Sequence, residues 1–178
     1  MHKDFDRVLL THEQIENRIT EMAAEIGRDY ADKNPLFIGI LKGSVFFFAD
    51  LLRHLSMPGE IDFMSVSRYG MGSESSGTVR MLKDVDRPIT GRHVVIVEDI
   101  VDSGTTLAYL HEMLLSRGPA SVRICTLLDK PDRRKTPVDI AYCGFTIPDE
   151  FIVGYGIDYA EKYRLYPDIY VLSPSAYR

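Results

Sequence analysis

Residues 98–106, with the sequence EDIVDSGTT, place three carboxylates, three hydroxyls and a glycine in one short stretch. The stretch follows a buried apolar run and leads into a helical pattern, so it reads as a loop between a strand and a helix. A helix N-terminus leaves backbone N–H groups without helical partners, and serine and threonine hydroxyls add donors. This combination predicts a cradle for a monophosphate. The loop has no lysine, unlike the GxxxxGK[ST] pattern, which argues against a triphosphate clamp.

The adjacent carboxylates Glu98 and Asp99 lie directly upstream of this loop. They could hold sugar hydroxyls or a hydrated divalent cation. Ordinary structural roles explain any one of these residues alone, because Asp102 and Ser103 suit a helix cap and an acidic pair suits a solvated strand end. The whole string in one place favours a ligand site over those roles.

The elements around the loop follow from periodicity. Residues 94–97 (VVIV) are β-branched throughout, which is typical of a strand covered on both faces. Leu107, Leu110 and Leu114 then recur at helical spacing until Gly118 and the proline after it end the helix. Residues 122–128 read as the next strand, so this region predicts a strand–helix–strand unit.

The rest of the chain repeats this alternation. Residues 11–14 (THEQ) carry the capping-box pattern, and apolar residues at helical spacing follow as far as Ile26. We expect further strands at residues 36–41, 61–69, 151–153 and 169–172, and a helix between Gly43 and Pro58. The pattern predicts an α/β fold with a mainly parallel central sheet flanked by helices. Ligands bind beyond the carboxyl ends of the strands in such sheets, where every motif described here lies.

Composition narrows the class of protein. The chain has 178 residues, with 21 basic and 26 acidic side chains and a net charge of −5, and 45% of its residues are hydrophobic. This length predicts one domain with a single core. No apolar run approaches the ~20 residues of a spanning helix, and no secretory signal follows Met1, so we expect a cytoplasmic protein without a membrane partner. Cys125 and Cys143 suit buried thiols, and the acidic balance argues against a nucleic-acid partner.

Residues 94–106 resemble the phosphoribosyl-pyrophosphate signature of the type I phosphoribosyltransferases, in the form VEDIVDSGTT that bacterial hypoxanthine-guanine members carry. Five further segments match the family's pyrophosphate loop, the stretch after its lid and its purine-site segments: residues 41–43, 82–84, 128–134, 151–159 and 161–164. These landmarks span residues 36–172 in the family's order and spacing, nearly the whole chain.

The resemblance implies the type I phosphoribosyltransferase fold over residues 1–178 as a single domain. Its core would cover about residues 36–145, its purine-binding hood would come from the N-terminal and C-terminal segments, and its flexible lid would cover about residues 68–80. The implied reaction moves a 5-phosphoribosyl group from phosphoribosyl pyrophosphate to N9 of hypoxanthine, with guanine as a second substrate. The products are the purine nucleoside 5′-monophosphate and pyrophosphate.

The resemblance also assigns the phosphoribosyl side of the site. The 5′-phosphate would bind Asp102, Ser103, Gly104, Thr105 and Thr106, and the ribose hydroxyls would face Glu98 and Asp99. Asp102 would lie against purine N7 as the catalytic carboxylate. Pyrophosphate would bind Leu41, Lys42, Gly43 and Arg164. The implied cofactor is Mg²⁺, with Glu98, Asp99 and Asp158 as its carboxylates.

On the purine side, the resemblance assigns Lys130, Phe151, Ile152 and Asp158. Lys130 would donate to the exocyclic O6 of a 6-oxopurine, Phe151 would stack on the ring, and backbone groups of Ile152 would contact the Watson–Crick edge. Without the family match, a solvated loop would explain Lys130 and a core position would explain Phe151. In the lid, Arg68 precedes Tyr69 where the family usually has a serine.

The partners implied are phosphoribosyl pyrophosphate and the base, in a homodimer or homotetramer. Two alternative functions stay open at this point. One is a phosphoribosyltransferase that prefers xanthine, because Lys130 and Phe151 do not distinguish it from hypoxanthine. The other is a non-catalytic regulator that binds nucleic acid on the same fold, which the presence of Asp102 and the net charge of −5 disfavour.

Overall fold

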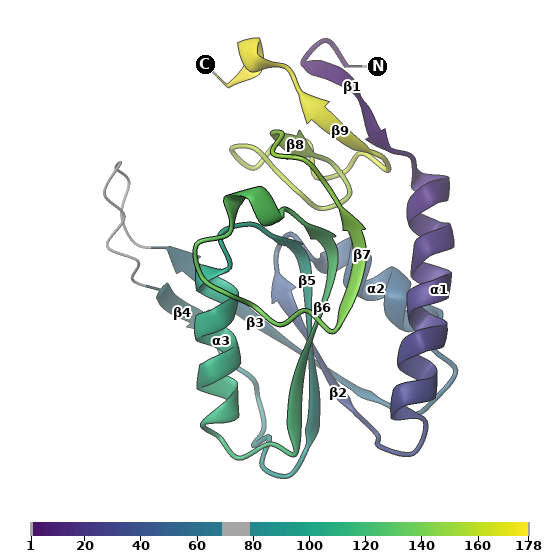
Figure 1. Ribbon diagram of the computed structural model, residues 1–178, viewed down its shortest axis with the longest axis vertical. Coiled ribbons are helices and arrows are strands. Elements are labelled where there is room, and N and C mark those ends of the chain that lie inside the picture. Colours follow the sequence, from purple (N-terminus) through teal and green to yellow (C-terminus); the bar gives the residue numbers. More distant parts are fainter. Residues whose placement is uncertain (1, 69–78, 178) are drawn as a thin grey trace.

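A computed structural model describes residues 2–68 and 79–177 (Figure 1). The central feature is a six-stranded sheet in the order β4-β3-β2-β5-β6-β7. Its members are β2 (Leu36–Leu41), β3 (Glu60–Arg68), β4 (Val79–Lys83), β5 (His93–Val101), β6 (Ser121–Asp129) and β7 (Tyr142–Thr146). Five of them pair in parallel and β4 pairs antiparallel with β3, which confirms the α/β fold with a mainly parallel sheet.

Helices cover both faces of this sheet. α1 (His12–Tyr30) and α2 (Val45–Arg53) pack on one face, and α3 (Thr105–Leu115) packs on the other. The central strand β5 is therefore buried on both of its faces. Val95 and Val97 join the core under α1 and α2, while Val94 and Ile96 join the core under α3. All four are fully buried, as the β-branched run predicts.

A second, antiparallel sheet in the order β1-β9-β8 brings the two ends of the chain together. It consists of β1 (Phe5–Leu10), β8 (Ile152–Val153) and β9 (Ile169–Leu172). Two short 3₁₀ helices, η1 (Pro131–Arg133) and η2 (Pro174–Ala176), complete the described elements. Figure 1 shows the three-stranded sheet at one end of the molecule, beside both termini.

Strand register places the motif loops at that same end. β5 pairs in parallel with β2 and with β6, with Gly39 opposite Val97 and Asp129 opposite Val101. The segments after these three strands therefore leave one edge of the sheet side by side. They are the loops that begin at Lys42, Asp102 and Lys130.

The predicted elements agree with the structure at most positions. The strands predicted at residues 36–41 and 169–172 match β2 and β9 at both ends, and the other predicted helices and strands differ by a few residues at their ends. Sequence periodicity missed β1, β4 and β7. Residues 69–78 of the expected lid, which include Tyr69, lie outside the described part of the chain.

The N-terminus of α1 forms the predicted capping box. Thr11 Oγ1 accepts from Gln14 N at 3.2 Å, and Gln14 Oε1 accepts from Thr11 N at 2.9 Å. We expect Thr11→Ala to lower the free energy of unfolding by about 1 kcal/mol, because it leaves a first-turn N–H group without this partner. Urea denaturation measures the change. The control is Thr20→Ala in the middle of the same helix, where Ala has the higher helix propensity. A Thr11→Ala protein as stable as the control would contradict the stabilising role of the cap.

Candidate active site

Hydrogen bonds from the segment after β6 hold the loop after β5 in place. Lys135 N and Thr136 N both donate to Ser103 O, at 2.9 and 3.0 Å. Thr105 Oγ1 and Thr136 Oγ1 lie 3.2 Å apart within hydrogen-bond reach. Gly104 is the N-cap residue of α3 and brings no side chain to the first turn of that helix. The predicted phosphate cradle is therefore a braced turn at a helix N-terminus, a geometry suited to an anion.

The acidic pair Glu98 and Asp99 lies at the end of β5, next to this loop. Burial raises the pKa of the Glu98 carboxyl well above its usual range, and the neighbouring charge of Asp99 raises it further. Burial also raises the pKa of Asp99, while hydrogen bonds from Glu98 and from backbone amides oppose that rise. Both carboxyls therefore hold their protons more tightly than usual, and a cation bound at the pair would favour their charged forms.

The turn after β2 lies against this acidic pair. The Leu41–Lys42 peptide bond is cis, and Val45 N donates to Lys42 O at 3.1 Å. A Cβ atom on Gly43 would lie 2.0 Å from Asp99 Oδ2, so only glycine allows the two segments to approach so closely. The structure thus joins the predicted pyrophosphate loop to the predicted ribose and metal carboxylates.

Glu161 ties together the two predicted pyrophosphate-binding cations. Its carboxylate lies 3.1 Å from Lys42 Nζ through one oxygen and 3.1 Å from Arg164 Nη2 through the other. These contacts, first with Lys42 and then with Arg164, hold the pKa of Glu161 below its usual range. Arg164 also contacts Asp158 Oδ1 at 3.1 Å, and its buried Nε has no hydrogen-bond partner among the described residues. A carboxylate of the chain itself thus neutralises both cations.

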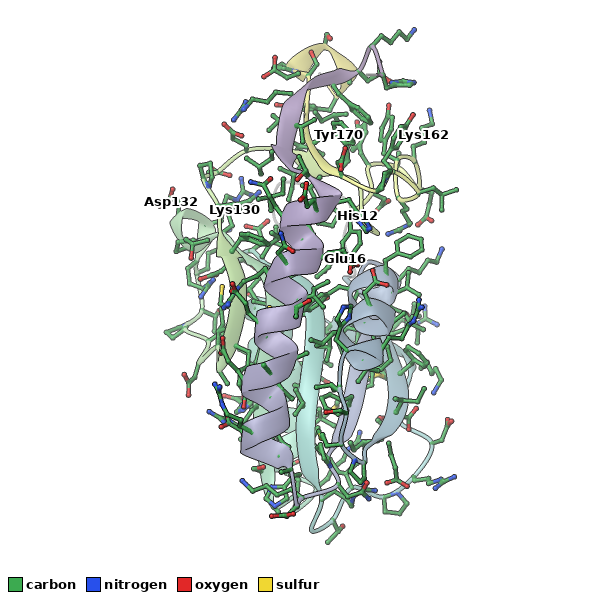
Figure 2. All side chains as sticks on the ribbon, turned by 90° about the vertical axis from the view of Figure 1, so that its right-hand side faces the viewer. His12, Glu16, Lys130, Asp132, Lys162 and Tyr170 are labelled. Atoms are coloured by element: carbon green, nitrogen blue, oxygen red, sulfur yellow. The ribbon has the colours of Figure 1, made fainter. Side chains whose placement is uncertain are left out.

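A pocket of about 430 Å³ opens beside the loop, between the central sheet and the three-stranded sheet. Its lining includes all four predicted purine-binding residues, Lys130, Phe151, Ile152 and Asp158. Lys130 is 7% exposed and its Nζ donates to Glu150 O at 2.8 Å, so it is a buried pocket residue and not a solvated one. Figure 2 shows Lys130 just below the three-stranded sheet.

Backbone groups of Ile152 also face this pocket region. β8 is an edge strand of its sheet, and Leu172 N donates to Phe151 O at 2.8 Å. Ile152 lies opposite Val171 in the antiparallel register. Because hydrogen-bonded and non-hydrogen-bonded pairs alternate in such a ladder, the N–H and C=O of Ile152 point away from β9. This direction leaves them available to the edge of a planar ligand.

A second pocket, of about 330 Å³, lies on the other side of Asp102. It is lined by the acidic pair and the cradle: Glu98, Asp99, Ile100, Val101, Asp102, Gly104, Thr106 and Leu107. Ile100 and Asp102 line both pockets. Asp102 Oδ1 lies 3.3 Å from Arg133 Nε, yet this buried oxygen has no hydrogen-bond partner among the described residues. The arrangement brings one carboxylate to the boundary between a purine-sized and a sugar-sized space.

The acidic pair fits a hydrated magnesium ion. Among the residues described, no group of three His, Cys, Asp or Glu side chains is close enough to hold a metal by itself. Mg²⁺ does not need one, because it keeps several waters and usually binds one or two carboxylates together with substrate phosphates. Glu98 and Asp99 supply such a pair, while both oxygens of Asp158 contact the chain itself, at Glu161 N and Arg164.

Some pocket residues were not predicted from the sequence. Arg133 belongs to a charged run with no periodicity to single it out, and Tyr177 lies in the C-terminal tail. Ile100 was inside the recognised string, where an apolar residue at a strand end could have signalled a ligand contact. The side chain of Arg68 in the predicted lid lies outside the described part of the structure.

Comparisons with known proteins agree with this geometry. A family model described as the phosphoribosyl transferase domain matches residues 8–160. A hypoxanthine-guanine phosphoribosyltransferase of Bacillus subtilis is 48% identical over 177 residues, which cover 99% of this chain and 98% of the relative. One of Mycobacterium avium is 52% identical over 181 residues, covering 98% and 89%. The crystal structure of a hypoxanthine phosphoribosyltransferase from Staphylococcus aureus matches with a TM-score of 0.96 at 47% identity, covering 100% and 97%.

The Glu161 contacts lead to a prediction about pyrophosphate. We expect Glu161→Gln to bind magnesium pyrophosphate about two- to tenfold more tightly, because the ligand no longer competes with a carboxylate for Lys42 and Arg164. Isothermal titration calorimetry measures the affinity. The control is Glu60→Gln, which breaks the ion pair between Glu60 and Arg92. Neither of these residues lines either of the two pockets described above. Weaker binding by Glu161→Gln would mean that Glu161 orients the cations and does not compete with the ligand.

Proposed function

The chain belongs to the phosphoribosyl transferase family, and from this membership we propose that it is a purine-salvage enzyme. It transfers the 5-phosphoribosyl group from phosphoribosyl pyrophosphate to N9 of hypoxanthine and of guanine. The observation that carries the proposal is the pair of pockets that share Ile100 and Asp102. One is lined by the residues suited to a purine, and the other by those suited to a ribose 5-phosphate.

Asp102 acts at the boundary of the two pockets. In the reaction, the bond from ribose C1′ to the pyrophosphate oxygen breaks and the bond from C1′ to purine N9 forms. The base gives up a proton, and the carboxylate of Asp102, which lines the purine pocket, is the acceptor. The sugar is oxocarbenium-like as the bonds exchange, so the negative charges of Asp102 and of the acidic pair stabilise it.

The other residues bind and orient the donor. The braced loop of Asp102, Ser103, Gly104, Thr105 and Thr106 holds the 5′-phosphate at the N-terminus of α3. The turn of Leu41, Lys42 and Gly43, together with Arg164, receives the pyrophosphate. Glu98 and Asp99 would hold Mg²⁺ and the ribose hydroxyls, with Asp158 as a further carboxylate. The ion would supply charge neutralisation for the leaving pyrophosphate.

Purine recognition falls to the residues around the larger pocket. Lys130 Nζ donates to O6 of the base, a contact that the amino group of adenine does not accept. Phe151 stacks on the ring, and backbone groups of Ile152 meet its edge. A stacked base on an aromatic side chain contributes about 1–3 kcal/mol. Neither a preference for xanthine nor a non-catalytic role on nucleic acid gains support from the relatives or from the pockets.

Further features belong to the same proposal. The central sheet with its helices is the core of a single domain over residues 1–178, the three-stranded sheet is the hood, and the segment of Arg68 and Tyr69 is the lid. The enzyme works in the cytoplasm as a homodimer or homotetramer. No helix within the described residues is both long and apolar enough to cross a membrane.

Replacing the catalytic carboxylate tests the chemical step. We expect Asp102→Asn to lower kcat by about 100-fold or more, because an amide cannot accept the proton. The KM for phosphoribosyl pyrophosphate should change by less than about threefold, since loop amides bind the phosphate. Steady-state kinetics measures both, with the exposed Asp86→Asn as control. An unchanged kcat would remove Asp102 from proton transfer.

Base selectivity tests the purine pocket. We expect the wild-type protein, with donor and Mg²⁺, to convert hypoxanthine and guanine and to leave adenine unreacted. Lys130→Met should lower kcat/KM for hypoxanthine by about 10- to 100-fold, because a hydrogen bond from a charged donor is lost. The exposed Lys135→Met is the matched control. Chromatographic product assays follow each reaction. No turnover of any purine by the wild type would contradict the proposed function, and an unchanged hypoxanthine kcat/KM in Lys130→Met would contradict the O6 contact.

A further inference from the structure

The ring of Phe151 is stacked against the last described residue of the chain. The centroids of Phe151 and Tyr177 lie 4.6 Å apart, with an angle of 18° between the ring planes. Tyr159 forms a T-shaped pair with Phe151, with centroids 5.4 Å apart and ring planes at 89°, and its ring centroid lies 6.5 Å from that of Tyr177. Such offset-stacked and edge-to-face pairs are favourable aromatic geometries. The proposed purine-stacking ring is thus one member of a three-ring group.

The backbone fixes Tyr177 in this position. It follows η2, where Ala176 N donates to Ser173 O at 2.9 Å. Ser173 N in turn donates to Asp4 O at 2.8 Å, which ties the tail to the N-terminal segment. Tyr177 also packs on the hydrophobic cluster of Phe5, Val153 and Leu172. The tail is therefore docked on the three-stranded sheet and does not lie in solvent.

The stacked pair limits where a base can bind. A phenyl ring has two faces, and Tyr177 covers one of them. Phe151 is nevertheless 39% exposed with Tyr177 in place, and it lines the larger pocket, so part of its ring remains accessible to a base there. The pocket that Phe151 lines extends to Ile100 and Lys130. A base that reaches Lys130 and Asp102 would then lie between Phe151 and Ile100, with Tyr177 behind Phe151.

We propose that Tyr177 is a positioning residue for the purine, which braces Phe151 from the side opposite to the base. The inference rests on the proposed function, because it assumes that Phe151 stacks on the substrate. Tyr177 holds the Phe151 ring plane in the orientation that the base requires, so less ordering remains to be done when the base binds. Its hydroxyl has no hydrogen-bond partner among the described residues, so the ring itself provides the effect.

The experiment compares Tyr177→Leu, Tyr177→Phe and Tyr170→Leu with the wild-type protein. Tyr170 is the matched control, because it stacks on Phe5 at 4.2 Å and 18° in the same sheet but does not line the pocket. Figure 2 labels Tyr170 in the three-stranded sheet, above Lys130. Each variant is assayed for kcat, for the KM of hypoxanthine and for the KM of phosphoribosyl pyrophosphate. Calorimetry gives the affinity for the product IMP, and thermal unfolding reports folding.

We expect Tyr177→Leu to raise the KM for hypoxanthine and the Kd for IMP by about three- to tenfold, the range of one aromatic pair. The kcat and the KM for phosphoribosyl pyrophosphate should stay within about twofold, because Tyr177 touches neither Asp102 nor the phosphate loop. Tyr177→Phe should restore the wild-type values, since it keeps the ring. Tyr170→Leu should lower the unfolding temperature without a selective loss of purine binding.

Three results would overturn the inference while leaving the proposed function intact. A lower KM for hypoxanthine in Tyr177→Leu would show that Tyr177 occupies the place of the base and is displaced by it. An unchanged KM and Kd would show that Phe151 needs no brace. An equal loss of purine binding in Tyr170→Leu would assign the effect to general loosening of the sheet. A wild-type protein that neither turns over hypoxanthine nor binds IMP would instead reject the proposed function and the inference with it.

Discussion

The parallel pairing of β5 with β2 on one side and β6 on the other determines where the proposed phosphate, ribose and metal groups can lie. Because the carboxyl ends of parallel strands meet at one edge, the three loops after these strands must gather there. The register, with Gly39 opposite Val97 and Val101 opposite Asp129, determines how far along the strand direction each of the three loops begins. A strand buried on both faces cannot place charge in its middle at low cost, so the carboxylates of β5 occur only where it reaches the edge.

Most charged side chains of the candidate site are paired with one another. Glu161 pairs with Lys42 and Arg164, Asp158 pairs with Arg164, and Arg133 lies beside Asp102. These contacts keep flexible cations ordered without a substrate, and an incoming polyphosphate must displace some of them. The acidic pair differs, because the described structure gives Glu98 and Asp99 no cationic partner within ion-pair distance and burial raises both pKa values. The side chains proposed to bind pyrophosphate therefore already have ion-pair partners, whereas the carboxylates proposed to bind the metal cation have none among the described residues.

Local sequence signals predicted the features that depend on neighbours along the chain. The capping box at Thr11 and the buried run of β2 have the expected local structure. The string of residues 98–106 joins a strand to a helix as expected, but its loop is shorter than predicted, because residues 98–101 belong to β5 and α3 begins at Thr105. Strands β1 and β7 escaped because their burial does not alternate cleanly, and β1 pairs with β9 from the other end of the chain. The side chains of β4 alternate between half-buried and exposed and none is fully buried, so the apolar signal of this strand is weak. The sequence likewise shows four basic residues among the six after Asp129, but not that Lys130 turns inward and Arg133 turns to Asp102. Such choices depend on tertiary contacts that no spacing encodes.

The two halves of the substrate are bound by two different sheets, and their alignment depends on how the sheets meet. The central sheet carries the loops proposed for the phosphates and the ribose together with Lys130 and Asp102, whereas β8 and the C-terminal tail carry the other proposed base contacts. One direct contact between them involves Gly156, whose φ of +95° suits glycine and whose added Cβ would lie 2.2 Å from Gly43 O. Arg164 spans the same junction, since its Nη1 donates to Gly156 O at 2.8 Å. The turn proposed to receive pyrophosphate therefore also supports the segment that holds the base, so a change in one half of the site can reach the other through a few ångströms of backbone.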